Sequence, residues 1–159
     1  MNNIGHFFIG NALCRVVNGG KLTLPSFVRS TLDLRSGART ILVGAHESDS
    51  CLLAYDRTFS AALARDCNRR RIAEEAADPA LHHARTRRIF GLVEEAGIDA
   101  RGRVELPAMM RRRARIDDLA LVVGTGGAFE IWSPQAALDS GDPALRELAA
   151  FHLDLPIAA

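Results

Sequence analysis

The sequence predicts a mainly β, α+β fold in which two similar halves share one hydrophobic core. The first observation is an internal duplication. Three short segments occur twice in the same order, at residues 22–29 and 104–111, 42–44 and 122–124, and 52–55 and 129–132. The second observation is size, because 159 residues that are 48% hydrophobic can bury one modest core. A repeat of this kind restricts the fold more tightly than local propensities do.

The first half is predicted to consist mostly of short strands. β-branched, aromatic and alternating apolar residues place these strands at 6–11, 12–17, 21–24, 39–45 and 50–55. Between the second and third lies Asn18-Gly19-Gly20, a strong signal for a hairpin turn. Pro25 then starts a short helix, expected to cover residues 26–32, because proline is well tolerated in the first helical turn.

Two helices are predicted after the first half. Asp56 is expected to be the N-cap of a helix that runs to about Arg71. Its apolar face would be formed by Phe59, Leu63 and Cys67. Asp78 followed by Pro79 predicts a second helix, since it places a capping residue directly before a proline.

The second half repeats the pattern of the first. Strands are expected at 89–98, 103–106, 119–124 and 128–132, with a helix starting at Pro107 and a hairpin turn at 124–127. Ser133-Pro134 and Asp142-Pro143 start two closing helices, the first ending at Gly141. The second is expected to bury Leu145, Leu148 and Ala149.

Each predicted half would have unpaired strand edges if it stood alone. Two halves remove these edges by interleaving their hairpins into one closed sheet, which gives a pseudo-twofold barrel within one chain. We expect the limits of the parts to be 5–57 for the first half, 58–86 for the connecting helices, 87–133 for the second half and 134–159 for the C-terminal helices. The turns near Gly20 and Gly102 should then emerge on the same side.

The segment 98–107 holds the most informative turn. Gly102 suits the positive φ of a tight turn, and Asp99 stands four residues before Arg103, so that the two side chains can bridge the turn. Arg101 and Arg103 would project from the tip, and the carboxylate would orient one guanidinium without neutralising both. The same pair also fits a purely structural turn clamp.

The charge of the chain is segregated along the sequence. The formal net charge is only +1, yet residues 81–120 hold nine arginines and six acids, whereas 121–159 hold one arginine and five acids. The arginine-rich run at 111–115 is typical of a solvated helix end, where cations complement the helix dipole. Arg69-Arg70-Arg71 is better explained by pairs on a helix surface than by contacts with DNA.

Other side chains give no prediction of catalysis or of a bound cofactor. Cys14, Cys51 and Cys67 are sparse and odd in number, which favours reduced cysteines over a metal site or disulfides. His82 and His83 are neighbours and would point about 100° apart on a helix, so neither metal nor cofactor is expected. Ser60, Cys67 and Ser133 have no placed histidine and acid, so the chain is not expected to be an enzyme.

No export or membrane-spanning segment is predicted. Residues 1–13 have no basic region and too short an apolar run, and no stretch of the sequence is long enough to cross a bilayer. We therefore expect a cytoplasmic protein.

Taken together, the motif at 99–107, its second copy at 22–25, the segment 51–56 and the segment 129–132 resemble the MraZ family. The resemblance covers roughly residues 8–141. It implies tandem SpoVT-AbrB swapped-hairpin halves. It also implies a transcriptional regulator that binds repeated short boxes of double-stranded DNA in the promoter of its own division and cell-wall gene cluster. Such a protein would assemble into a ring of several copies and associate with the nucleoid.

The resemblance also implies which residues contact DNA. The family's Asp-x-x-x-Arg signature is intact in the second half, at Asp99 and Arg103 with Arg101 between them. In the first half Val17 and Lys21 take these two places, while Gly20 keeps the turn and Arg15 lies close by. The planar guanidinium of arginine suits bidentate contacts with a guanine or a phosphate, whereas the ammonium of lysine is a point charge that tolerates many phosphate geometries. We therefore expect base discrimination from the second half and attraction to the phosphate backbone from the first.

A different class of function stays open. A swapped-hairpin module with weakened DNA affinity, similar to an antitoxin, could instead hold a partner protein. The acidic helices after residue 121 would then be the partner surface.

Overall fold

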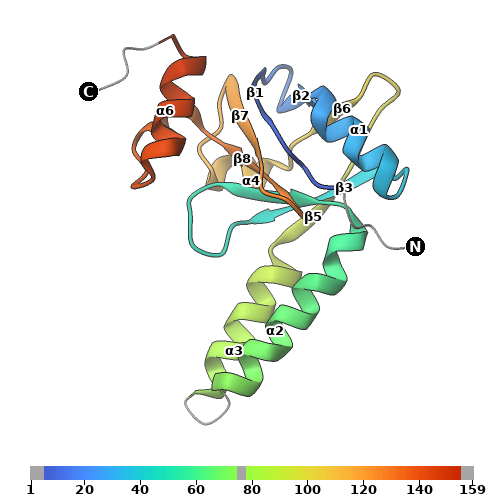
Figure 1. Cartoon of the computed structure of the whole chain (residues 1–159), viewed down its shortest axis with the longest axis vertical. Coiled ribbons are helices and arrows are strands. Elements are labelled where there is room, and N and C mark those ends of the chain that lie inside the picture. The colour runs from blue at the N-terminus through green and yellow to red at the C-terminus, as the bar shows by residue number, and fades with distance from the viewer. Residues whose placement is uncertain (1–5, 75–77, 155–159) are drawn as a thin grey trace.

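The computed structural model describes residues 6–74 and 78–154, so the predicted outer limits at residues 5 and 159 lie outside the described residues (Figure 1). The strands are β1 (Asn11–Arg15), β2 (Lys21–Thr23), β3 (Thr40–Ala45), β4 (Leu52–Tyr55), β5 (Val93–Gly97), β6 (Arg103–Glu105), β7 (Leu119–Gly124) and β8 (Phe129–Trp132). The helices are α1 (Ser26–Arg35), α2 (Ser60–Glu74), α3 (Pro79–Thr86), α4 (Ala108–Arg113), α5 (Pro134–Leu138) and α6 (Pro143–His152). The fold class is the predicted α+β class.

Strand pairing shows that the two halves exchange strands. β1 of the first half pairs with β7 of the second, and β5 of the second half pairs with β3 of the first, all antiparallel. β4 and β8 pair at the centre, which gives a six-stranded sheet in the order β1-β7-β8-β4-β3-β5. β2 and β6 pair separately, so the hydrogen bonds are divided between two sheets where one closed sheet was expected.

The core is shared by both halves because their strands interleave. Leu22 and Leu24 of the first copy lie in one apolar cluster with Val104 and Leu106 of the second, and all four are almost fully buried. This is the burial that the alternating Leu-x-Leu-Pro pattern predicts. A smaller cluster forms where α6 packs near Trp132.

Several predicted elements have different limits. Residues 6–10 do not form a strand, and Phe8 makes only an isolated bridge to Gly126. The segment Arg87–Gly91 is π-helical, so β5 begins later than expected. α1 extends beyond Leu32 to Arg35, and α5 ends at Leu138. The ends of these elements are therefore not where local sequence signals placed them.

Asp56 has a role different from the predicted helix cap. It precedes a 3-10 turn at Arg57–Phe59, and its side chain makes no capping hydrogen bond. Arg35 Nη2 instead donates to Asp56 Oδ1 at 3.0 Å, and the Ser36 hydroxyl donates to Oδ2 at 3.0 Å. The side chains of Arg35 and Asp56 are 6% and 0% exposed. This buried ion pair joins the end of α1 to the end of β4.

The helices α2 and α3 form a hairpin that projects away from the sheets (Figure 1). Cys67 is the one residue of α2 that is buried, so the predicted apolar face with Leu63 is not part of the core. Arg70 pairs with Asp66 at 3.0 Å and with Glu47, and Arg69 pairs with Asp66 at 3.4 Å, as predicted for a helix surface. Asp78 caps α3 as predicted, accepting from the Ala80 N–H at 3.0 Å.

Candidate nucleic-acid interface

The turn between β5 and β6 is held by a carboxylate clamp. Asp99 Oδ1 accepts hydrogen bonds from the backbone N–H groups of Arg101 and Arg103, both at 2.9 Å. Asp99 Oδ2 accepts from Arg103 Nε at 2.9 Å. The clamp leaves the terminal nitrogens of Arg103 free of Asp99, and Arg101 is exposed at the tip. The geometry is that of the predicted turn.

The hydrogen bonds of this clamp lower the pKa of the Asp99 carboxyl. The largest cause is the Arg103 N–H, followed by the Arg103 guanidinium and the Arg101 N–H, which outweigh the cost of desolvation. A lowered folded pKa stabilises the turn at pH values above the ordinary aspartate pKa of about 3.9. That contribution is lost only as the pH falls through the lowered value, so the clamp is fully formed at neutral pH.

The turn between β1 and β2 keeps part of this hydrogen-bond pattern without the carboxylate, although Asn18 and Gly19 have positive φ where only Gly102 does in the second turn. Gly20 N–H donates to Val17 O at 3.1 Å, as Gly102 N–H donates to Asp99 O at 3.0 Å. The two turns also bind each other's strands, because Leu24 N–H donates to Gly102 O and Leu106 N–H donates to Gly20 O, both at 2.9 Å. The first turn therefore keeps its place between the halves, with a different backbone conformation and without the motif that orients a cation.

Each turn glycine is covered by an arginine from the other half. A Cβ at Gly102 would come within 2.6 Å of Arg29 Cδ, and a Cβ at Gly20 would come within 3.1 Å of Arg111 Cζ. Both glycines also have positive φ, 75° and 109°, which a side chain would strain. Arg29 and Arg111 were not among the predicted site residues. The sequence did contain a signal for these two arginines, since each is the last residue of one copy of the duplicated segment.

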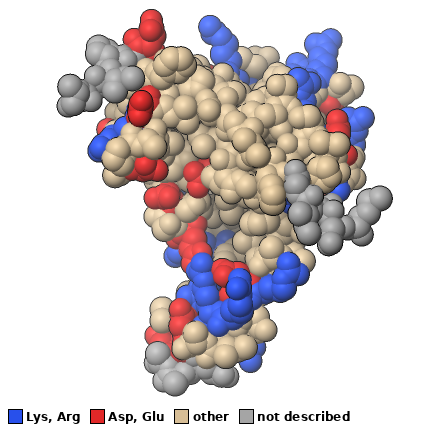
Figure 2. Space-filling model, viewed as in Figure 1, with Lys and Arg blue, Asp and Glu red and all other residues tan. Residues whose placement is uncertain are grey.

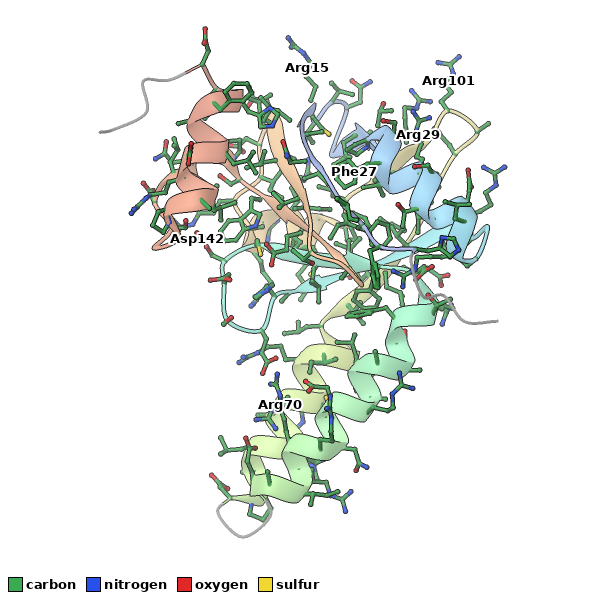
Figure 3. All side chains as sticks on the ribbon, viewed as in Figure 1. Arg15, Phe27, Arg29, Arg70, Arg101 and Asp142 are labelled. Atoms are coloured by element: carbon green, nitrogen blue, oxygen red, sulfur yellow. The ribbon has the colours of Figure 1, made fainter. Side chains whose placement is uncertain are left out.

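Two of the predicted DNA-contacting residues, Arg15 and Arg101, lie together with Arg29 at one end of the molecule, opposite the α2–α3 hairpin (Figure 3). Figure 2 shows Lys and Arg side chains projecting there, and a separate basic group where the hairpin meets the body. Both turns open toward this end (Figure 1).

Lys21 and Arg103 occupy matching places but have different neighbours. In the β2–β6 ladder Glu105 lies directly opposite Lys21, whereas Thr23 lies opposite Arg103. Side chains opposite each other on one face of a ladder interact, so an acid partly offsets the charge of Lys21. Arg103 has a hydroxyl residue opposite it instead.

One cluster has the residue types of a metal site. Ligand atoms of His46, Cys51 and Glu130 lie within 4.8 Å of one another. The donors and acceptors there are already paired: His46 Nε2 lies 3.1 Å from Glu130 Oε2, and Trp132 Nε1 donates to Glu130 Oε1 at 2.9 Å. Backbone N–H groups of Ser48 and Asp49 donate to His46 Nδ1 at 3.1 and 3.0 Å. The cluster is thus satisfied as a network that ties the β3–β4 loop to β8.

The remaining candidate side chains lie apart from the two turns. Cys14, Cys51 and Cys67 are free thiols, and burial raises the pKa of Cys14 to about 11. The Ser133 hydroxyl accepts from the Ala136 N–H at 3.4 Å, at the start of α5. Within residues 6–74 and 78–154, no helix is long and apolar enough to span a bilayer.

The sequence is similar to proteins that carry one shared name. The family model described as "MraZ protein, putative antitoxin-like" matches residues 89–136. The chain is 31% identical to "Transcriptional regulator MraZ" of Saccharophagus degradans over 143 residues, which cover 84% of this chain and 91% of that protein. Proteins of the same name from Oleidesulfovibrio alaskensis (33% over 147 residues, 87% and 91% covered) and Cytophaga hutchinsonii (29% over 129 residues, 80% of each) are also similar. The chain belongs to the MraZ family.

Proposed function

We propose that this protein is a transcriptional regulator that binds double-stranded DNA through the end of the molecule formed by its two hairpin turns. The single observation that carries the proposal is the clamped turn, where Asp99 holds Arg103 at a tip that also presents Arg101. A guanidinium fixed in orientation suits bidentate contact with a guanine edge or a phosphate. The name of the similar proteins, transcriptional regulator, supports the same function.

The two turns are proposed to make different kinds of contact with DNA. Arg103, with its carboxylate clamp, reads bases. Lys21 and Arg15 attract the phosphate backbone, because nothing in the first turn fixes the direction of either cation. The opposed Glu105 further weakens the first turn as a site of specific contact. The proposed targets are repeated short boxes in the promoter of the protein's own division and cell-wall gene cluster.

A ring of several copies is proposed as the active form. One molecule offers a small basic patch, and several patches at fixed spacing engage repeated boxes with much higher avidity. Exposed apolar side chains on both added helical regions support subunit contacts there: Ile72 on α2 is 67% exposed, Leu81 on α3 is 50% exposed, and Phe151 on α6 is 71% exposed. The projecting hairpin leaves the turn-bearing end free for DNA.

Replacement of Ile72 by aspartate is expected to reduce the mass of the assembly, because a charge would have to be desolvated in a subunit contact. The measurement is light scattering at micromolar concentration. Leu34→Asp is the matched control, since Leu34 is equally exposed, at 65%, but lies on α1. A monomeric mass for the unmodified protein would contradict the ring.

A salt titration tests the proposed function against the partner-binding alternative. DNA binding through several phosphates should weaken steeply as salt rises, since each contact releases condensed counterions. Association of an acidic helix with a partner groove through apolar contacts would not show this slope. Binding of upstream DNA with no dependence on salt would contradict the proposal.

A further inference from the structure

The first turn lacks an internal acceptor at the place where the second turn has one. Arg101 N–H donates to the Asp99 carboxylate, and the residue 82 positions earlier in the sequence is Gly19. Val17 offers no side-chain acceptor in the position of Asp99. Among the described residues, Gly19 N–H makes no hydrogen bond. The exposed Gly19 therefore presents an unpaired donor at the tip of this turn.

Three arginines of the second half line the cleft beside this turn. The cleft has a volume of about 700 Å³ and is bounded by the turn and by the end of α4, including Arg111, Arg112 and Arg115. None of the ion pairs within residues 6–74 and 78–154 includes any of these arginines. Asp117 and Asp118 also line the cleft, so the site is mixed in charge with an excess of arginine.

The matching cleft beside the second turn is different. It is smaller, about 350 Å³, and is lined by two arginines and one aspartate, Arg29, Arg39 and Asp33, whereas three arginines and two aspartates line the first. The helix beside the turn that kept its own Asp-x-x-x-Arg motif gives this cleft one arginine and one aspartate, Arg29 and Asp33. The turn that lost the motif has an arginine-rich one, brought to it by the exchange of halves.

Arg115 is held in a conformation that arginine disfavours. It follows α4 with φ of 55°, in the left-handed region. The corresponding position after α1 is Gly37, with φ of 63°, the residue that usually ends a helix in this way. A non-glycine residue kept in this conformation points to a requirement for its side chain.

We propose that this cleft binds a phosphodiester group of the DNA backbone, with the Gly19 N–H and the guanidinium groups of Arg112 and Arg115 as donors. The phosphate oxygen would accept from a turn amide, as the Asp99 carboxylate does in the other turn. Guanidinium groups and turn amides are the donors that phosphate contacts use. The inference rests on the proposed function and adds that α4 supplies backbone contacts to the first turn.

The test compares three variants of the full-length protein, Arg112→Ser, Arg115→Gly and, as the control, Arg113→Ser. Arg113 is on the same helix but does not line this cleft; it lines a separate one that Arg115 also borders, so Arg113→Ser removes the same charge outside the proposed site. We expect the slope of log K against log salt to fall by about one for each cleft arginine removed, per subunit engaged, and to be unchanged for Arg113→Ser. Arg115→Gly should also raise the melting temperature, so that its weaker binding cannot be attributed to unfolding.

Equal slopes for all three variants, with DNA binding intact in the unmodified protein, would overturn this inference and leave the proposed function standing. Absence of DNA binding by the unmodified protein would overturn both. Inorganic pyrophosphate is the probe for a free ligand. A rise in melting temperature with pyrophosphate that Arg112→Ser abolishes, together with unchanged DNA slopes, would assign the cleft to a small phosphate compound and overturn the DNA assignment.

Discussion

Arg103→Ala is expected to flatten the preference of the protein for its cognate promoter over scrambled DNA. The Arg103 guanidinium is held in direction by Asp99 through its Nε, which leaves the terminal nitrogens for a bidentate contact. Loss of one such contact costs about 1–3 kcal/mol of discrimination. The measurement is the ratio of dissociation constants for promoter and scrambled duplexes at one salt concentration.

Lys21→Ala is the control for this prediction, because Lys21 has the equivalent position in the first turn. It should weaken binding to both duplexes alike. A loss of discrimination in Lys21→Ala, combined with uniform weakening in Arg103→Ala, would mean that the roles of the two turns are reversed.

Arg35→Met is expected to cause the largest loss of stability of any change considered for this chain. It leaves the Asp56 carboxylate, which is 0% exposed, without its cationic partner. Arg35 Nη1 also donates to Gly127 O at 2.9 Å, and its guanidinium lies 5.0 Å from the centre of the Phe8 ring. Removing one partner of a buried pair typically costs about 3–5 kcal/mol. Urea unfolding at one fixed protein concentration measures the change.

The double variant Arg35→Met/Asp56→Asn controls for the unpaired charge. Both variants lack the contacts of Arg35, but the double variant also lacks the buried charge of Asp56. The double variant should therefore be more stable than Arg35→Met alone. A cost below about 1 kcal/mol for the single variant would show that the pair does not hold α1 to β4.

The sequence was sufficient to predict features that depend on neighbouring residues. The clamp of Asp99 on Arg103 spans four positions, and the cap at Asp78 spans two, so turn and capping chemistry identify both. The duplication predicted the exchange of strands, because each half alone has unpaired strand edges. Two copies can pair these edges by interleaving their strands. The prediction of a strand at 6–11 was wrong, because Phe8 is buried in the core but makes only an isolated bridge.

Contacts between distant residues were not predictable in the same way. Asp56 has the sequence context of a helix cap, and only the packed structure brings Arg35 to it from 21 positions earlier. Likewise, the arginine run at 111–115 looks like a solvated helix end until strand exchange places Arg111 against Gly20. The strained Arg115 also has no local signal, because its φ depends on how α4 ends.

The central claim is that the end of the molecule bearing the two turns binds specific DNA. It is tested most directly by fluorescence-anisotropy titration of the unmodified protein with its own upstream promoter DNA and with a shuffled duplex, at two salt concentrations. We predict tighter binding to the promoter, with both affinities falling as salt rises. Equal binding to the two duplexes, or no binding to either, would contradict the claim and direct attention to a protein partner.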